Sequence, residues 1–384
     1  MSKEHSLPSV RLPLVTLTPL FLGGADQRGD PELRASSIRG ALRFWLRALL
    51  GGCYGTDDQA LAEIRRLEAE TFGEAGGEGK AGASTIVVRT TRVRMQKQAF
   101  EENLQSLTYL LFGMQKVGPL NARQYFIPGS QFNLMLEGRS GTSVEQQEKA
   151  LRRALLATWL LIHLGGVGAR SRRAAGSVGV RLHSVKMPEG GRRYQPVLLQ
   201  GLPFHLRSQL DDAAQRFGDT LSRIRQELGA QSRPLQSLPQ WEILHPQACS
   251  IWLFSFDKLT STSQKADKGR EQHFVADSDW QLAMNQLQQL LRNIRGEFKE
   301  IDDRAVFGAP LRGSQVQKMR RPSPLLLSVT LAANGQLMGV VTLFRAQLYK
   351  DPGLVDSSLL DKLTKAVDRQ LRSSFSNVAE VQYA

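Results

Sequence analysis

The most chemically suggestive stretch of the sequence is a glycine- and arginine-rich run, GGVGARSRRAAGSVG, at residues 165–179. Its glycines let the backbone approach a ligand and turn N–H groups outward. Arg170, Arg172 and Arg173 supply forked donors that suit phosphate oxygens. Neither GxxxxGKS/T nor GxGxxG fits the run, which argues against a mononucleotide or dinucleotide loop. The run therefore predicts a site for a bent nucleic-acid backbone. The alternative is a solvated loop whose glycines merely end a helix.

A second basic motif, RASSIRGALRFWLR, occupies residues 34–47. Arg39, Arg43 and Arg47 recur every four residues, so they form one stripe on an otherwise apolar helix. The free N–H groups at the start of such a helix can bind a phosphate. The two aromatic residues of the motif fall off the stripe and are expected in the core. The alternative for the arginines is ion pairing with neighbouring acids.

A third basic segment lies at residues 308–321, in a polar loop before an apolar strand. Its cations are Arg312, Lys318, Arg320 and Arg321. Like-charged side chains in a loop beside a sheet edge can reach phosphates. An ordinary solvated surface is an equally good reading of this segment.

Catalytic signals are weak. None of the six histidines belongs to an HExxH motif, and no Cys or acid stands at ligand spacing, so we expect no metal and no cofactor. Asp26 and Asp30 flank Arg28 in a glycine-rich loop at residues 23–33, where two carboxylates can hold a divalent ion or act as a base. Carboxylates in such loops more often serve turns. His163 precedes the glycine-rich run, where a structural donor is commoner than a base.

The charge balance points to a polyanionic partner. The 384 residues carry 50 Lys and Arg against 36 Asp and Glu, a formal net charge of +14. Residues 151–200 alone hold nine basic side chains and one acidic. Such local concentration favours a nucleic acid, because excess charge that served only solubility would be spread evenly.

Length and composition exclude several classes of protein. The length suggests two or three domains with sizeable cores. No apolar run approaches the roughly 18 residues of a membrane span, and the first ten residues lack an apolar signal core. Two cysteines, Cys53 and Cys249, are too few for a disulfide framework. We therefore expect a soluble, cytoplasmic protein with no membrane partner.

The elements that would position these motifs alternate in a recognisable order. In the first half we expect strands at residues 10–20, 84–95, 132–136 and 178–185, and helices at 36–50, 58–72 and 144–164. Pro13 suggests that the first strand lies at a sheet edge or start, and Gly51 and Gly52 are expected to end the first helix. The order of strands and helices is that of a ferredoxin-like unit, to which RNA-recognition-motif sheets belong. This unit would occupy residues 1–190.

The second half, residues 191–384, reads as another αβ unit whose strand order the sequence does not give. Its helices are expected at residues 205–228, 280–298 and 359–371, and its strands at 249–256, 325–331 and 336–344. Asn334 and Gly335 predict a hairpin between the last two strands.

Three stretches resemble one known family. Residues 18–24, TPLFLGG, together with the 34–47 motif are similar to the opening of the RAMP (repeat-associated mysterious protein) superfamily of CRISPR systems. Residues 165–179 match its glycine-rich loop, and residues 307–325 resemble a late segment. Within the superfamily the best match is to the first-numbered subunits of type III-B Cmr effector complexes. The resemblance covers the first 185 residues well and little of the second half.

The resemblance implies an α+β protein with two ferredoxin-like (RRM-like) βαββαβ domains in tandem. It also implies a place at the end of the complex distant from the polymerase-like subunit, beside backbone RAMP proteins. There the subunit would help to hold the 3′ part of the guide RNA and the target RNA. On this analogy RNA contacts fall on Ile38, Arg39 and Arg43, and on the arginines of the glycine-rich loop. Cleavage belongs to the backbone subunits, whose active aspartate lies in the loop that holds Asp26 and Asp30 here.

The leading hypothesis is thus a non-catalytic RNA-binding subunit of an RNA-guided, RNA-targeting antiviral complex. The residues predicted to bind RNA are Arg28, Arg34, Ser37, Ile38, Arg39, Arg43, Gly166, Gly168, Arg170, Arg172, Arg173, Lys318, Arg320 and Arg321. One alternative is a RAMP endoribonuclease that uses Asp26 or Asp30 with a metal ion, or His163 without one. Another is a structural end-cap whose basic surface meets acidic protein neighbours.

Overall fold

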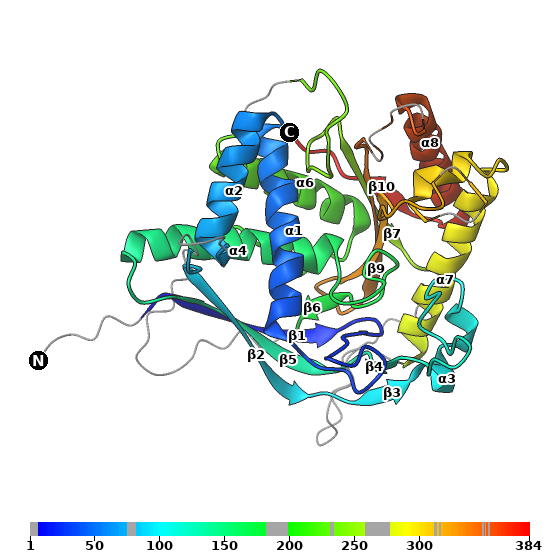
Figure 1. Ribbon diagram of the computed structural model, residues 1–384, viewed down its shortest axis with the longest axis horizontal. Coiled ribbons are helices and arrows are strands. Elements are labelled where there is room, and N and C mark those ends of the chain that lie inside the picture. The colour runs from blue at the N-terminus through cyan, green and yellow to red at the C-terminus, as the bar shows by residue number, and fades with distance from the viewer. Residues whose placement is uncertain are drawn as a thin grey trace, which may run out of the picture.

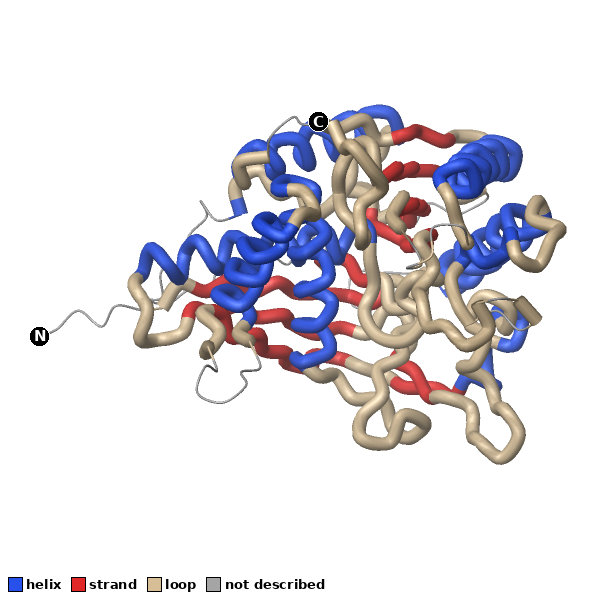
Figure 2. Tube along the Cα trace, turned by 45° about the horizontal axis from the view of Figure 1, so that its top comes forward, coloured by secondary structure: helices blue, strands red, loops and turns tan. Residues whose placement is uncertain are grey.

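Two four-stranded antiparallel sheets organise the protein. The computed structural model describes residues 7–74, 82–181, 199–230, 234–257, 277–310, 313–314, 316–347, 349, 351 and 354–384. Arg312 and the expected domain boundary at residue 190 lie outside these ranges. Figure 2 shows most of the strands in two groups, each with helices beside it, and a further short pair apart from them, so the fold is α+β as predicted. No helix in the described ranges is long and apolar enough to cross a membrane.

The first sheet follows the predicted βαββαβ order. Its strands are β1 (Ser9–Thr16), β2 (Ile86–Arg94), β5 (Gln131–Gly138) and β6 (Val178–Val180), arranged β2-β5-β1-β6. Its helices are α1 (Ala35–Tyr54), α2 (Asp58–Phe72) and α4 (Val144–Leu164). An insertion between β2 and β5 contains a small two-stranded sheet of β3 (Lys97–Ala99) and β4 (Gln124–Phe126). Between these strands lie α3 (Phe100–Asn103) and the 3-10 helix η1 (Gln105–Leu107).

The second sheet repeats this order of strands and helices. Its strands are β7 (Cys249–Ser255), β8 (Leu325–Leu331), β9 (Leu337–Phe344) and β10 (Val378–Glu380), arranged β10-β7-β9-β8. Its helices are α6 (Leu210–Glu227), α7 (Asp277–Gly296), the 3-10 helix η2 (Asp303–Phe307) and α8 (Ser357–Ser374). The strand order is the part that the sequence left open. It places β8 at one edge of this sheet.

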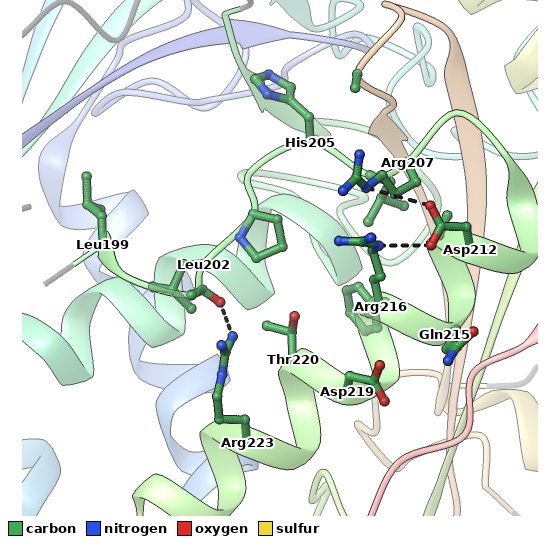
Figure 3. Close-up of a pocket in the computed structure, with 16 residues that line it drawn as sticks. Leu199, Leu202, His205, Arg207, Asp212, Gln215, Arg216, Asp219, Thr220 and Arg223 are labelled. Carbon is green, nitrogen blue, oxygen red and sulfur yellow. Dashed lines mark hydrogen bonds and ion pairs between the residues drawn. The ribbon is translucent and has the colours of Figure 1, made fainter. Parts of the chain in front are cut away.

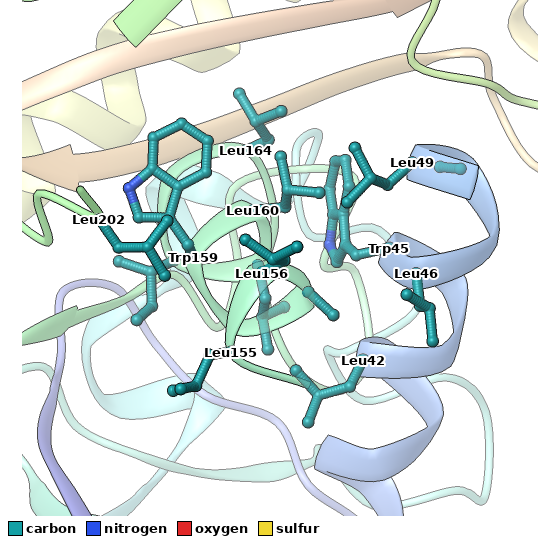
Figure 4. Close-up of a cluster of buried hydrophobic side chains, with 14 of the residues drawn as sticks. Leu42, Trp45, Leu46, Leu49, Leu155, Leu156, Trp159, Leu160, Leu164 and Leu202 are labelled. Atoms are coloured by element: carbon teal, nitrogen blue, oxygen red, sulfur yellow. The ribbon is translucent and has the colours of Figure 1, made fainter. Parts of the chain in front are cut away.

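Two helices of the first half cross over a large apolar core. Figure 4 shows Leu42, Trp45 and Leu49 of α1 facing Leu156 and Leu160 of α4. Trp45 of the 34–47 motif lies in this core, as predicted, whereas Phe44 is half-buried and packs against it. Full burial of each large apolar side chain contributes about 1.5–3 kcal/mol, so this crossing holds α1 firmly.

The second sheet is covered on both faces. Helices α7 and α8 lie on one side of it and α4 and α6 on the other (Figure 1). Trp252 and Phe254 of β7 pack toward α7 and α8, whereas Ile251 and Leu253 join the core of the first half. Every residue of β8 and β9 is accordingly buried. This sheet therefore has no open face of the kind that RNA-recognition-motif sheets present to bases.

Pro13 lies in the middle of a sheet, not at an edge as expected. Strand β1 pairs with β5 on one side and with β6 on the other. The carbonyl oxygen of Pro13 accepts a bond from the Arg181 N–H just beyond the end of β6, which pairs only with residues 14–16. The ring nitrogen of Pro13, which carries no hydrogen, therefore lies beyond the paired residues of the short strand β6. No backbone hydrogen bond from this position is needed there.

Gly51 and Gly52 do not end the first helix, which runs on to Tyr54. A Cβ on Gly51 would lie 2.6 Å from Cγ2 of Ile243, and a Cβ on Gly52 would collide with the carbonyl oxygen of Leu244. These glycines let a segment of the second half approach α1, so their role is close packing.

Helix α6 begins at Leu210, later than predicted. Leu206 donates its N–H to Leu331 at 3.0 Å and accepts from Ala333 at 2.8 Å, beside the end of β8. Because this pairing holds the backbone extended, the helix starts only after it. By contrast, α2, α4 and β8 have the predicted bounds.

Replacing Gly52 by Ala should lower the free energy of unfolding by about 1–3 kcal/mol, because the new methyl group overpacks a backbone contact. Gly40→Ala is the matched control on the same helix. A Cβ there meets nothing within 4 Å, so that change should stabilise the helix by up to about 1 kcal/mol. Urea denaturation of both variants measures the difference, and equal effects would contradict the packing role.

Candidate nucleic-acid interface

The glycine-rich loop is an ordered, tightly packed segment. Gly168 has a φ of 87°, and a Cβ there would collide with the carbonyl oxygen of Phe21. That same oxygen accepts the N–H of Ala169 at 2.9 Å. A Cβ on Gly166 would lie 2.7 Å from the Ala175 carbonyl oxygen. Both glycines thus serve close backbone packing, so the loop backbone is held in place, although Gly168 and Arg170 are exposed.

The loop continues onto the exposed edge of the second sheet. Ala174 donates its N–H to Leu327 of β8 at 2.8 Å, and Leu327 donates to Arg172 at 3.2 Å. Residues Arg173 and Leu327 form the parallel bridge between them. In the described part of the chain, Arg170 and Ala174 are the non-glycine residues with positive φ, 61° each. Such backbone strain costs about 1–3 kcal/mol per residue and clusters at functional sites.

A cavity of about 800 Å³ opens beside the loop. It lies between the loop, residues 109–114 of the insertion, α7 and two short segments at 307–310 and 321–323. Its cations are Arg170, Arg172, Arg173, Arg295 and Arg321. None of the described residues that line it is an Asp or Glu. This space is named the arginine cavity below.

The cations in and beside the cavity lie close enough together that the charge of one lowers the pKa of the next. Burial lowers the pKa of Arg173 to about 10, and the charges of Arg295 and Arg170 add to this. Burial and the charge of Arg123 lower the pKa of Arg170. Burial and the charge of Arg28 lower that of Arg123. An anion bound among these residues would relieve the repulsion between them.

Two of the cavity's arginines are structural. The Nη2 atom of Arg172 lies 3.3 Å from Glu242 and its Nη1 atom donates to the Ser323 carbonyl at 2.6 Å. Its guanidinium also sits 5.1 Å from the centre of the Phe44 ring. Arg321 lies 4.0 Å from the same Glu242 carboxylate. These two cations are largely neutralised, and they hold the loop against α1 and the segment before β8.

The other three cavity arginines have no ion pair with a described acid. Arg173 donates to the Leu325 carbonyl at 3.4 Å, and the Arg295 guanidinium lies 5.3 Å from the Phe307 ring centre. Arg170 is exposed. The loop arginines predicted to bind RNA are therefore of two kinds, and α7 contributes a further cation, Arg295, that the sequence did not reveal.

The insertion brings aromatic side chains to the same place. Phe112 and Tyr109 both line the cavity, and the side chain of Phe112 is 65% exposed. The Arg292 guanidinium lies 4.9 Å from the Tyr109 ring centre. In the sequence these residues belong to the apolar run YLLF, which is typical of a core, so only the structure identifies them as surface groups.

The arginine stripe of α1 is mostly paired, as the alternative reading held. Arg43 lies 2.7 Å from Glu68 of α2 and donates to the carbonyl of Phe72 at 2.8 Å. Arg47 lies 2.9 Å from the same carboxylate. Arg39 is exposed and pairs with no described acid. Of the three, Arg39 is thus the cation available to a ligand.

The other predicted residues near α1 have mixed environments. Ile38 is 1% exposed and belongs to the core, so its side chain is not available to a ligand. Arg34 lies 3.5 Å from Glu32, and Ser37 donates its N–H to the Arg34 carbonyl. Arg28 donates to the carbonyls of Gln115, at 3.2 Å, and Asn121, which ties its loop to the insertion.

In the third basic segment, Lys318 and Arg320 are exposed but do not line the arginine cavity. Arg321 does line it. The fourth cation, Arg312, lies outside the described residues. Among the described cations of the three predicted segments, those that line the arginine cavity are thus the loop arginines and Arg321.

The carboxylates considered for catalysis have structural roles. Asp26 accepts the N–H of Arg28 at 2.8 Å, which closes a turn. Asp30 lies 2.6 Å from Lys97, and its hydrogen bond with that lysine lowers the pKa of the Asp30 carboxyl. Across the described ranges no three His, Cys, Asp or Glu side chains gather as metal ligands would.

His163 is buried between the two halves of the protein. Its Nδ1 lies 2.9 Å from the Thr330 hydroxyl of β8, and its Nε2 lies 3.0 Å from the Pro203 carbonyl oxygen. Burial lowers the pKa of His163 to about 4. The ring is neutral near pH 7 and out of reach of a large substrate, so it is a structural donor.

A second cavity, of about 810 Å³, lies between α6 and residues 199–207. Arg207 and Arg216 both bind Asp212, at 3.6 and 2.9 Å, and Arg223 donates to the Gly201 carbonyl (Figure 3). Two of its three arginines therefore pair with an acid, whereas three of the five that line the arginine cavity have no described acidic partner. This contrast singles out the arginine cavity as the anion site.

Comparisons with known proteins give consistent matches. A family model described as the RAMP superfamily matches residues 14–179. Two relatives are CRISPR system Cmr subunits of Pyrococcus furiosus. Cmr1-1 is 34% identical over 152 residues, 39% of this chain and 41% of the relative. Cmr1-2 is 30% identical over 185 residues, 44% of this chain and 93% of the relative. The matched part is thus less than half of Cmr1-1 but nearly all of Cmr1-2.

Solved structures with the same fold extend over nearly the whole chain. The apo crystal structure of Cmr1 from Pyrococcus furiosus has a TM-score of 0.61 at 24% identity, covering 98% of this chain and 99% of that one. A chain of type III-B Cmr-beta, bound to cognate target RNA and AMPPnP in the presence of single-stranded DNA, has a TM-score of 0.57 at 13% identity. It covers 94% of this chain and 100% of that one. At these identities the likeness is one of fold.

Arg43→Ala should lower the free energy of unfolding by about 1–3 kcal/mol, because it leaves the carbonyl groups of Phe72 and Gly73 at the end of α2 without this donor, and Glu68 with Arg47 alone among its described partners. Arg39→Ala, one turn earlier, should change it by less than about 0.5 kcal/mol. Urea denaturation measures both values. Equal losses would show that Arg39 also has a structural partner.

Because of His163, the free energy of unfolding should decrease as the pH is lowered. The unfolded chain takes up a proton on this ring below a pKa of about 6.5, whereas the folded chain resists until about 4. Between pH 7 and 5 the free energy of unfolding should therefore drop by about 2 kcal/mol more in the wild type than in His163→Gln. Denaturation at both pH values tests this, and parallel pH profiles would contradict it.

Proposed function

This chain belongs to the RAMP superfamily and, within it, to the Cmr1 subunits of type III-B CRISPR Cmr complexes, and from this premise we propose that it is a non-catalytic RNA-binding subunit. The resemblance seen in the sequence is thereby confirmed. In our proposal the subunit holds the 3′ part of the guide RNA and the target RNA for antiviral defence. Its partners would be these RNAs and the other Cmr subunits, backbone RAMP proteins included.

The two βαββαβ units are best understood as ferredoxin-like domains in tandem, with the boundary near residue 190. The identical strand order of the two sheets supports this division. The apolar core of the first half also takes in α6 and one face of the second sheet. The two domains would therefore act as one body toward RNA.

The observation that carries the proposal is the uncompensated charge of the arginine cavity. Arg170, Arg173 and Arg295 line it without a described acidic partner. Phosphate groups release counterions when they bind such cations, and this supplies much of the affinity of proteins for nucleic acids. Exposed aromatic side chains beside a cationic groove suit single-stranded RNA. Arg39 and the exposed Lys318 and Arg320 would extend the contact.

The placement of the catalytic candidates supports a non-catalytic role. Asp30 is held by Lys97, Asp26 closes a turn, and His163 is buried and neutral. A base must lie within hydrogen-bond reach of the proton that it removes. His163 fails this condition, and the two aspartates are engaged locally. In our proposal, RNA cleavage is therefore left to other subunits.

Replacing both Arg170 and Arg295 by Ala should weaken binding of single-stranded RNA and reduce the slope of log affinity against log salt by about two, since each removes about one phosphate contact. Arg65→Ala is the control, because Arg65 is exposed on α2, away from the cavity. Filter binding at several salt concentrations gives both quantities.

Two outcomes would contradict the proposal. Unchanged affinity in the double variant would exclude the arginine cavity as the RNA site. Cleavage of labelled guide precursor or target RNA by the pure protein with magnesium, lost in Asp26→Ala, would instead support a RAMP endoribonuclease.

A further inference from the structure

We propose that the arginine cavity holds one unstacked nucleotide of the bound RNA, with its phosphate on Arg170, Arg173 and Arg295 and its base against Phe112. This inference rests on the proposed RNA-binding function. It goes further in assigning a distinct pocket that reads the base as well as the backbone charge.

The cavity has the size and the mixed walls of a small-ligand site. Its volume of about 800 Å³ falls within the roughly 300–1,000 Å³ of typical ligand pockets. Leu110, Met114 and Leu291 add apolar surface to the same lining. A phosphate alone would leave this apolar surface unused, whereas a nucleotide has a charged end and a flat, largely apolar base.

The three unpaired guanidinium groups fix where the phosphate would lie. Arg170 and Arg173 come from the loop and Arg295 from α7, so they approach the space from two different elements. Each of the other two charges lowers the pKa of Arg173, which places all three in electrostatic contact. The single negative charge of one RNA phosphodiester among them would offset part of this repulsion.

The backbone of the loop is strained at this point. Arg170 and Ala174 hold a φ of 61°, a conformation that side-chain-bearing residues rarely adopt. Strain of this kind persists at ligand clamps because the surrounding structure over-determines it. Here Ala174 donates its N–H to Leu327 of β8, so the strained segment is held against the sheet edge. A Cβ on Gly113 would lie 3.1 Å from Nη2 of Arg170, so this glycine leaves room for the guanidinium.

Phe112 supplies the base-stacking surface. It precedes Gly113 in the insertion, lines the cavity and is 65% exposed, although it is a large apolar side chain. Stacking of a base on an aromatic ring contributes about 1–3 kcal/mol in single-stranded complexes. A base must leave its neighbours to reach the ring, and this costs least in a single strand.

The test compares two probes of equal charge on the full chain. One is the RNA trimer of three uridines, and the other is the same ribose-phosphate trimer without bases. The wild type should bind the uridine trimer about tenfold more tightly than the base-free trimer. Phe112→Ala should bind both equally, and Arg170→Gln should weaken both by the same factor. Val144→Ala, which alters an exposed apolar residue at the start of α4, is the control and should keep the tenfold preference.

Each other outcome overturns the proposal in a recognisable way. Equal affinity of the wild type for the two trimers would show a site for charge alone, with the proposed RNA-binding function intact. Binding of neither trimer nor longer RNA would remove the function itself. Uridine monophosphate that binds more tightly than the uridine trimer would assign the cavity to a free nucleotide. Displacement of the trimer by hexaglutamate but not by RNA would assign it to an acidic protein.

Discussion

The pairing of the glycine-rich loop with the edge of β8 is the interaction on which the rest of the structure depends. An exposed strand edge presents unpaired N–H and C=O groups, and here Arg172 and Ala174 satisfy those of Leu327. Leu331 at the end of the same strand accepts the N–H of Leu206, and the hydroxyl of Thr330 contacts His163. The two sheets are thereby fixed to each other, and the backbone of the loop takes the conformation that the edge requires.

This docking divides the arginines of the loop into two kinds. Arg172 turns toward Glu242, Ser323 and Phe44 and becomes part of the packing between the halves. Arg170 and Arg173 face the cavity, where Arg295 joins them. Unpaired cations held close together cost free energy in the folded state, since each depresses the pKa of another. Their arrangement is understandable if a polyanion completes it.

Burial of the second sheet moves the binding surface from strands to loops. Its faces are covered by α7 and α8 on one side and by α4 of the first half together with α6 on the other (Figure 1). An RNA-recognition-motif sheet binds bases on an open face, which this sheet lacks. The candidate interface therefore lies where the loop, the insertion and α7 meet.

The sequence by itself determined the periodic elements and the location of excess charge. The bounds of α2, α4 and β8, and the core position of Trp45, follow from local apolar patterns, which depend on neighbours along the chain. It could not decide that Gly51 and Gly52 lie inside α1, that Arg43 pairs with Glu68, or that Phe112 is exposed. Those facts depend on contacts between distant segments. Only the tertiary structure decides which arginines find an acid and which are left for a ligand, because charge partners are chosen in space.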